Sequence, residues 1–102
     1  MPGDAKVTET ELRENIRDAA KKLGYGFYFS WTSLHSPKGF PDLVLCRPPR
    51  LILAELKTDS GKTSPEQDEW LAALVGCPGV EVFLWRPADW GSGEIARVLS
   101  GK

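Results

Sequence analysis

The sequence predicts an α/β fold in which a mixed β-sheet is flanked by helices, in the order αβββαβ. Apolar residues recur at helical spacing over residues 8–23 and 64–75, whereas residues 25–31, 43–57 and 80–85 contain short aromatic or apolar runs of strand length. The succession of strand, helix and strand between Leu51 and Trp85 implies a parallel pair with a right-handed crossover. With 102 residues, 41% of them hydrophobic, we expect one domain spanning residues 1–102.

The first helix has a clear start and end. Thr8 and Glu11 have the spacing of a capping box, and Gly24 is expected to end the helix. The residues expected to face the core recur every three or four positions: Leu12, Ile16, Ala19, Ala20 and Leu23. Residues 25–31 then predict an aromatic strand, followed by a polar loop.

Helical phase separates Glu9 from the other acidic residues of this helix. At about 100° per residue, Glu9 lies about 60° from Leu12 and within the apolar stripe, while the other three acidic residues lie on the solvent side. A glutamate in this position either interacts with the helix dipole or reaches a metal at the sheet edge. Both interpretations stay open from the residues alone.

Residues 39–57 predict a β-hairpin that turns at Pro48 and Pro49. If its strands pair symmetrically about this turn, Asp42 lies opposite Glu55. Because side chains alternate along a strand, Asp42, Glu55 and Lys57 share one face, on which Cys46 is expected to be a small core residue.

Two carboxylates opposed in this way have Cβ atoms about 4.5 to 5.5 Å apart and repel each other unless one is protonated or a cation lies between them. A divalent cation with oxygen ligands would remove the conflict. The alternative is an ordinary turn aspartate next to a solvated Glu-x-Lys ion pair. The apolar runs on both strands favour a buried site.

The second half of the chain predicts a helix, a strand and a short helix. Ser64 is the expected N-cap, Pro65 lies in the first turn, and the apolar stripe is Trp70, Leu71, Leu74 and Val75. Gln67 has the position of a capping-box residue or of a site residue, and capping is the simpler interpretation. Residues 80–85 form the last strand, and a turn from Pro87 precedes a short helix from Glu94.

Charge and cysteine content narrow the function classes. The net charge is −1, but residues 34–62 carry a local excess of basic groups once the two carboxylates are set aside. The residues expected to contact phosphates are His35, Lys38, Arg47, Arg50 and Lys62. Two cysteines without Cys-x-x-Cys spacing and a single histidine argue against zinc or a disulfide framework. No signal peptide or membrane-length run is evident, so we expect a cytoplasmic protein.

Four segments together resemble the VRR-NUC branch of the PD-(D/E)XK nucleases: Glu9, Gly39-Phe40-Pro41-Asp42, Glu55-Leu56-Lys57 and Ser64-Pro65-Glu66-Gln67. The resemblance implies a restriction-endonuclease-like core and binding of Mg²⁺ or Mn²⁺ by Asp42 and Glu55, with the Leu56 carbonyl and Glu9 as further ligands. It implies that Lys57 orients or activates the attacking water and that Gln67 belongs to the catalytic set. Arg13 departs from the family pattern, where glutamine is frequent.

Stand-alone domains of this size resemble phage and bacterial members that act as homodimers on branched DNA, including four-way (Holliday) junctions. The leading hypothesis is therefore a Mg²⁺- or Mn²⁺-dependent endodeoxyribonuclease of branched DNA, with flap or linear duplex DNA as alternative substrates. Two further hypotheses are a nucleic-acid-binding module that does not cut, and a protein-interaction module that uses exposed aromatics such as Trp31 or Trp90.

Overall fold

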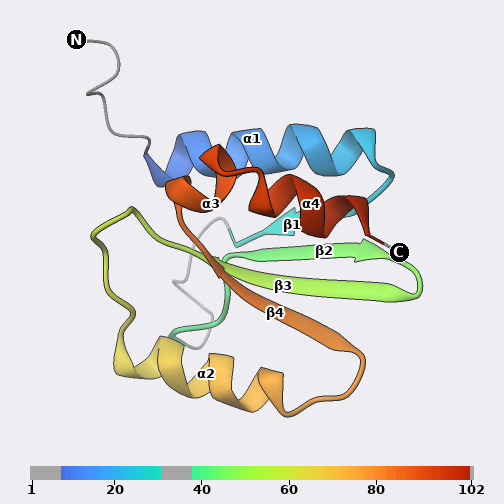
Figure 1. Ribbon diagram of the computed structural model, residues 1–102. Coiled ribbons are helices and arrows are strands. Elements are labelled where there is room, and N and C mark those ends of the chain that lie inside the picture. The colour runs from blue at the N-terminus through green and yellow to red at the C-terminus, as the bar shows by residue number, and fades with distance from the viewer. Residues whose placement is uncertain (1–7, 31–37, 102) are drawn as a thin grey trace, which may run out of the picture.

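The computed structural model describes residues 8–30 and 38–101, which form one mixed sheet with helices on both sides (Figure 1). The elements follow in the order α1 (Glu9–Lys22), β1 (Gly26–Phe29), β2 (Leu43–Arg47), β3 (Arg50–Leu56), α2 (Pro65–Val75), β4 (Val80–Trp85), α3 (Pro87–Gly91) and α4 (Glu94–Ser100). Helices α1 and α4 lie together on one side of the sheet and α2 lies on the other. The described part contains no helix that is both long and apolar enough to span a membrane.

The sheet has the strand order β1-β2-β3-β4. Strand β2 pairs antiparallel with both β1 and β3, whereas β3 and β4 are parallel and are connected through α2. The predicted α/β class, mixed sheet and αβββαβ order are therefore confirmed. Because β3 and β4 are parallel, their C-terminal ends lie at the same end of the sheet. Strand β2 runs in the opposite direction, so Asp42, which directly precedes β2, lies at this same end.

The hairpin has the register that symmetry about the two prolines predicts. Arg47 pairs with Arg50 at the turn, and Leu43 pairs with Ala54 at the other end. Extending this register by one residue places Asp42 opposite Glu55, just beyond the last residue of β2. The predicted facing relationship of these two acidic residues therefore follows from the observed pairing.

Helix α1 is capped as the sequence predicts. The Thr8 hydroxyl accepts a 3.0 Å hydrogen bond from the Glu11 backbone, and the Glu11 carboxylate accepts a 3.0 Å bond from the Thr8 backbone. Gly24, with a φ of +87°, follows the end of the helix in the left-handed conformation that glycine adopts readily. The cap positions both the start of α1 and the phase of its apolar face.

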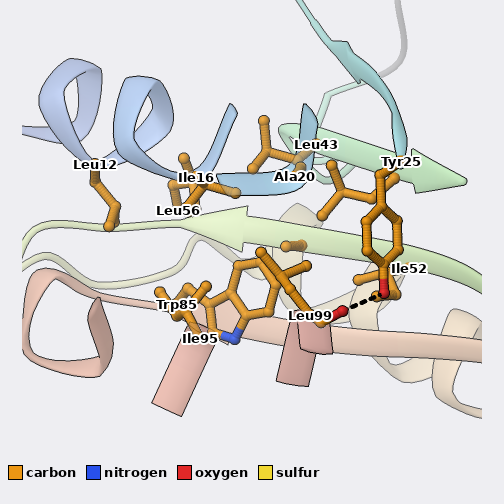
Figure 2. Close-up of a cluster of buried hydrophobic side chains, with 12 residues drawn as sticks. Leu12, Ile16, Ala20, Tyr25, Leu43, Ile52, Leu56, Trp85, Ile95 and Leu99 are labelled. Carbon is orange, nitrogen blue, oxygen red and sulfur yellow. Dashed lines mark hydrogen bonds between the residues drawn. The ribbon is translucent and has the colours of Figure 1, made fainter. Parts of the chain in front are cut away.

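The hydrophobic core fills the space between the sheet and the helices α1 and α4 (Figure 2). It contains alternate residues of β2 and β3, such as Leu45, Ile52 and Ala54, all fully buried. The Tyr25 hydroxyl donates a 2.9 Å hydrogen bond to the Leu99 carbonyl and so attaches α4 to the end of α1. Because Ala54 and Leu56 face this core, Glu55 between them faces the opposite side, toward α2.

Three details differ from the sequence-based expectations. Cys46 is exposed, so the prediction that it is a core residue is wrong. It lies on the face of the sheet opposite Leu45, and this face stays uncovered at β2 because α2 packs mainly over β4. The predicted turn after Pro87 is the short helix α3, in which the Asp89 carboxylate caps the Arg86 backbone at 2.8 Å. Strand β1 is also shorter than predicted, and Trp31 lies outside the described residues.

Helix α2 begins at its predicted N-cap but packs loosely. None of its residues is fully buried, and the side chain of Val75 is 69% exposed. Only the side of α2 that faces β4 and the end of the Asp42 loop is partly covered. The first turn of α2 packs against Gly39 and carries Gln67, which contacts Glu55.

Candidate functional site

Asp42 is held against the end of β3 by the backbone of its neighbour strand. Its Oδ2 accepts a 2.9 Å hydrogen bond from the Leu56 N–H, and its own carbonyl accepts a 3.0 Å bond from the Ser30 N–H. Side chain and backbone of Asp42 are thus connected to different strands. This places its carboxylate next to that of Glu55, close enough for a hydrogen bond between the two when one is protonated.

Glu55 is a buried carboxyl group with one oxygen engaged and one unengaged. The residue is 1% exposed. Its Oε2 accepts a 2.8 Å hydrogen bond from the Gln67 Nε2, whereas Oε1 is buried and, when both carboxyls are ionised, has no hydrogen-bond partner among the described residues. A buried polar atom without a partner is costly, and its presence in a native fold calls for an explanation such as a bound ion.

The surroundings of Glu55 strongly disfavour its charged form. Burial is the largest cause, and together with the charge of the nearby Asp42 and a hydrogen bond to it, it raises the pKa of Glu55 to about 8. Lys57 opposes this increase, and Glu9 adds a small one. Two acidic groups in one partly enclosed site, with one lysine beside them, form an arrangement that a divalent cation would stabilise.

Lys57 follows β3 and lies beside the carboxylate pair. Its Nζ is 3.9 Å from Oε2 of Glu55, and its side chain is only 17% exposed. The loop after Lys57 is held by Arg86, which donates hydrogen bonds to the carbonyls of Thr58 and Gly61 at 2.7 and 2.6 Å. The predicted common face of Asp42, Glu55 and Lys57 is present.

Gln67 performs both of the roles that the sequence left open. Its side-chain oxygen Oε1 accepts a 2.8 Å hydrogen bond from the Ser64 backbone N–H, and its backbone N–H donates a 3.2 Å hydrogen bond to the Ser64 hydroxyl. Its amide nitrogen is then directed at Glu55. The capping box fixes the orientation of the amide group, so that its nitrogen is presented to the carboxylate.

The loop that carries Asp42 is packed directly on the first turn of α2. Gly39 has a φ of +93°, and a Cβ at this position would lie 2.5 Å from the Glu66 carbonyl carbon and 2.7 Å from the Gln67 nitrogen. The next residue, Phe40, makes an edge-on contact with Trp70, with ring centroids 4.9 Å apart. Gly39 and Phe40 belong to the sequence motif around Asp42, but their packing role depends on contacts with residues of α2 that lie more than 25 positions further along the chain.

Pro41 explains a gap in the backbone pairing beside the site. The hairpin register places Pro41 opposite Leu56. The backbone N–H of Lys57 donates a hydrogen bond to the Trp85 carbonyl of β4. Because backbone groups alternate in direction along a strand, those of Leu56 point the other way, toward β2. Proline has no N–H to donate. The Leu56 N–H pairs with the Asp42 side chain instead, and the Leu56 carbonyl faces the same side without a donor from Pro41.

Comparison with protein-family models gives a match to the VRR-NUC domain over residues 5–88. The chain belongs to the VRR-NUC family. This family assignment and the geometry agree, since every segment of the site lies within the matched range. Comparisons with curated proteins and with solved structures gave no match. The predicted resemblance to the VRR-NUC family is confirmed, and with it the restriction-endonuclease-like fold and the nuclease class.

In this VRR-NUC domain, Glu9 lies in the exposed first turn of α1, at the same end of the sheet as the carboxylate pair. Its charge reaches Glu55, since it contributes to the raised pKa of that residue. Within residues 8–30 and 38–101, no three acidic, histidine or cysteine side chains are grouped closely enough to hold a metal. The residues brought together in direct contact are therefore Asp42, Glu55, Lys57 and Gln67.

Two of the expected phosphate contacts have structural partners inside the VRR-NUC domain. Arg50 is buried, forms a two-point ion pair with Glu81 at 2.7 Å, and donates to the carbonyls of Val98 and Gly101. Arg47 lies over the Tyr25 ring and also donates to the Gly101 carbonyl. Both lie at the turn of the hairpin, at the opposite end of the sheet from Asp42. They attach the C-terminus to the sheet, and we do not retain them as DNA contacts.

The other expected phosphate contacts have different positions. Lys38 and Lys62 are exposed and flank the site, one on the loop before β2 and one on the loop before α2. Lys38 also lines a surface pocket of about 330 Å³ beside Trp70, together with Glu66, Glu69 and Ala73. His35 lies outside the described residues.

Proposed function

We propose that this VRR-NUC domain is an endodeoxyribonuclease that uses Mg²⁺ or Mn²⁺ to hydrolyse phosphodiester bonds. The observation that carries the proposal is Glu55, a buried carboxyl with an unpartnered Oε1 beside the carboxylate of Asp42. Hard divalent cations accept such oxygens as ligands and typically take one or two protein carboxylates, with water and phosphate completing the shell. The donor set therefore fits Mg²⁺ or Mn²⁺.

The residues that would hold the ion are Asp42 and Glu55, with the Leu56 carbonyl as a backbone ligand. Glu9, in the first turn of α1, would complete the set through water or on substrate binding. When bound, the metal would supply Lewis-acid stabilisation of the phosphate and a more acidic water. Glu55 would have to bind in its ionised form, so metal binding competes with its proton.

The remaining site residues act on position and charge. Lys57 lies close enough to Glu55 to orient a water at the carboxylate pair and to stabilise negative charge that develops on the phosphate. Gln67 holds Oε2 of Glu55 and leaves Oε1 available. Lys38 and Lys62 would contact flanking phosphates, which positions a strand without reading its sequence.

We further propose that the substrate is branched DNA and that two copies act together. The described domain offers a single carboxylate pair on a small surface, and cutting both strands of a junction would require two such sites. Cleavage rates on a four-way junction, a flap, a splayed duplex and a linear duplex would show which DNA structure the protein prefers. Preferential cutting of the junction together with a dimeric mass in solution would support this part of the proposal.

The chemical proposal is tested by cleavage of labelled DNA in Mg²⁺ and in Mn²⁺, with EDTA as the metal-free condition. Asp42→Ala should abolish cleavage, whereas Asp18→Ala, which removes an exposed carboxylate on the far side of α1, should leave it unchanged. Cutting by the Asp42→Ala protein, or cutting in EDTA, would contradict the assignment. DNA binding without cutting in either metal would point to a module that only binds.

A further inference from the structure

The six arginines of the chain all lie in the described ranges, and five of them are engaged by protein acceptors. On α1, Arg17 pairs with Glu14 and Asp18 at 3.5 and 3.7 Å. The other four engaged arginines are Arg47, Arg50 and Arg86, which donate to backbone carbonyls, and Arg97, which pairs with Glu94. Arg13 is the exception.

The Arg13 guanidinium is held in place without using its N–H groups. Its Cζ lies 4.1 Å from the centroid of the Phe29 ring, a cation–π contact that restricts the side chain. Arg13 makes no ion pair or hydrogen bond within the described part of the chain, although Glu9 precedes it by one helix turn. The result is an oriented, half-buried cation whose donors are not engaged by any group in residues 8–30 and 38–101.

Arg13 lies at the end of the sheet that carries the carboxylate pair. Phe29 is the last residue of β1, and the residue after it, Ser30, donates its N–H to the Asp42 carbonyl at 3.0 Å. One turn before Arg13, Glu9 is near enough to influence Glu55. The guanidinium therefore borders the same site from the α1 side, opposite the α2 side on which Lys38 lies.

We propose that Arg13 binds a backbone phosphate of the DNA strand that enters the site. This rests on the proposed function and adds a substrate-positioning residue to it. A polyanion that approaches Asp42 and Glu55 meets like charge, and Lys57 is already beside Glu55. A planar guanidinium with unengaged donors matches two phosphate oxygens at once, and its aromatic support reduces the conformational freedom lost on binding.

The test measures DNA binding in EDTA, where no cutting is expected, by fluorescence anisotropy over a range of salt concentrations. Arg13→Gln should weaken binding about tenfold and reduce the slope of log K against log salt by about one. Arg13→Lys retains the charge and should keep the wild-type slope. Arg17→Gln is the matched control on the same helix, because that guanidinium is already paired, and it should leave both affinity and slope unchanged.

Three results would overturn the proposal: an unchanged salt slope in Arg13→Gln, an equal loss in Arg17→Gln, or a slope in Arg13→Lys that matches Arg13→Gln. Circular dichroism melting of each variant confirms that a folded protein is compared. Failure here is distinguishable from failure of the proposed function. If cleavage requires Asp42 but DNA binding does not depend on Arg13, only the role of Arg13 is contradicted. If DNA binding depends on Arg13 but no cleavage occurs in Mg²⁺ or Mn²⁺, the proposed cleavage activity is contradicted instead.

Discussion

The side-chain amide of Gln67 donates a 2.8 Å hydrogen bond to Oε2 of Glu55 and so connects the first turn of α2 to the buried carboxyl of β3. The same amide group closes the capping box with Ser64. Formation of the helix and orientation of the site are thereby coupled through one side chain. The connection leaves Oε1 of Glu55 as the unpartnered oxygen.

Gln67→Glu separates these two roles. Glutamate also closes a capping box, so α2 should still form, but it has no N–H₂ to donate and adds a negative charge beside Glu55. We expect cleavage to fall by about 10- to 100-fold, as is typical when a residue that orients a metal ligand is lost. Ser64→Ala is the control: it should lower stability by about 1 kcal/mol while the folded protein keeps most of its activity. Equal activity losses in both variants would show that Gln67 acts through the helix alone.

Gly39→Ala tests the packing of the Asp42 loop on α2. The added methyl group would lie 2.5 Å from the Glu66 carbonyl carbon and would occupy a φ of +93°. Gly79→Ala is a matched control, because Gly79 has a φ of +83° but nothing within 4 Å of the added Cβ. Both substitutions should destabilise by about 1 kcal/mol or more from backbone strain, and Gly39→Ala should cost clearly more. Urea denaturation measures the difference, and equal losses would argue against the close approach.

The raised pKa of Glu55 predicts a pH dependence of stability in EDTA. The folded protein keeps the Glu55 proton up to a pKa of about 8, whereas the unfolded chain releases it near the ordinary value for glutamate, 4.5. Between these values the folded state binds more protons, so the contribution of Glu55 to stability is full below pH 4.5 and falls as the pH rises to 8. The slope due to this group should approach about −1.4 kcal/mol per pH unit.

The pH prediction is checked by comparing wild type with Glu55→Gln in urea titrations from pH 5 to pH 8. Because the glutamine does not titrate, the stability difference between the two proteins should change steadily in favour of the variant as the pH rises. A constant difference over this range would contradict the raised pKa of Glu55.

Divalent metal should stabilise the folded protein through the same carboxylates. Binding to the native state alone adds about 2.7 kcal/mol when the metal concentration is 100 times Kd. We expect a rise in Tm with Mn²⁺ or Mg²⁺ that EDTA reverses and that Asp42→Ala removes, while Asp18→Ala retains it. An equal rise in wild type and Asp42→Ala would place any bound metal elsewhere.

Arg50 should contribute to stability and not to DNA binding. Arg50→Ala leaves Glu81, Tyr25 and two backbone carbonyls without their donor. Because Arg50 is buried but the Glu81 side chain is 37% exposed, we expect a loss of about 1.5 to 3 kcal/mol, the range for a hydrogen bond to a charged group. Urea denaturation should show this loss. The affinity of the variant for DNA, measured below its unfolding transition, should match wild type. A weakened affinity with intact stability would restore Arg50 to the DNA-binding surface.

The cases of Cys46 and Arg50 show where sequence reasoning stops. Alternation places Cys46 and Leu45 on opposite faces, but it does not say which face the helices cover. In the same way, a basic residue at a hairpin turn is equally compatible with a phosphate contact and with an internal ion pair. The partner of Arg50 is 31 residues away, on a strand that becomes its neighbour only when β3 and β4 pair.

What the sequence by itself determined is local and periodic: the helix caps at Thr8 and Ser64, the α/β order, and the hairpin register that brings Asp42 opposite Glu55. These depend on residues close together in the chain, where spacing alone dictates geometry. What only the tertiary structure decided is how the pieces meet: the contact of Gln67 with Glu55, the packing of Gly39 on α2, and the unengaged donors of Arg13. These depend on burial and on partners distant in sequence, which no local spacing encodes.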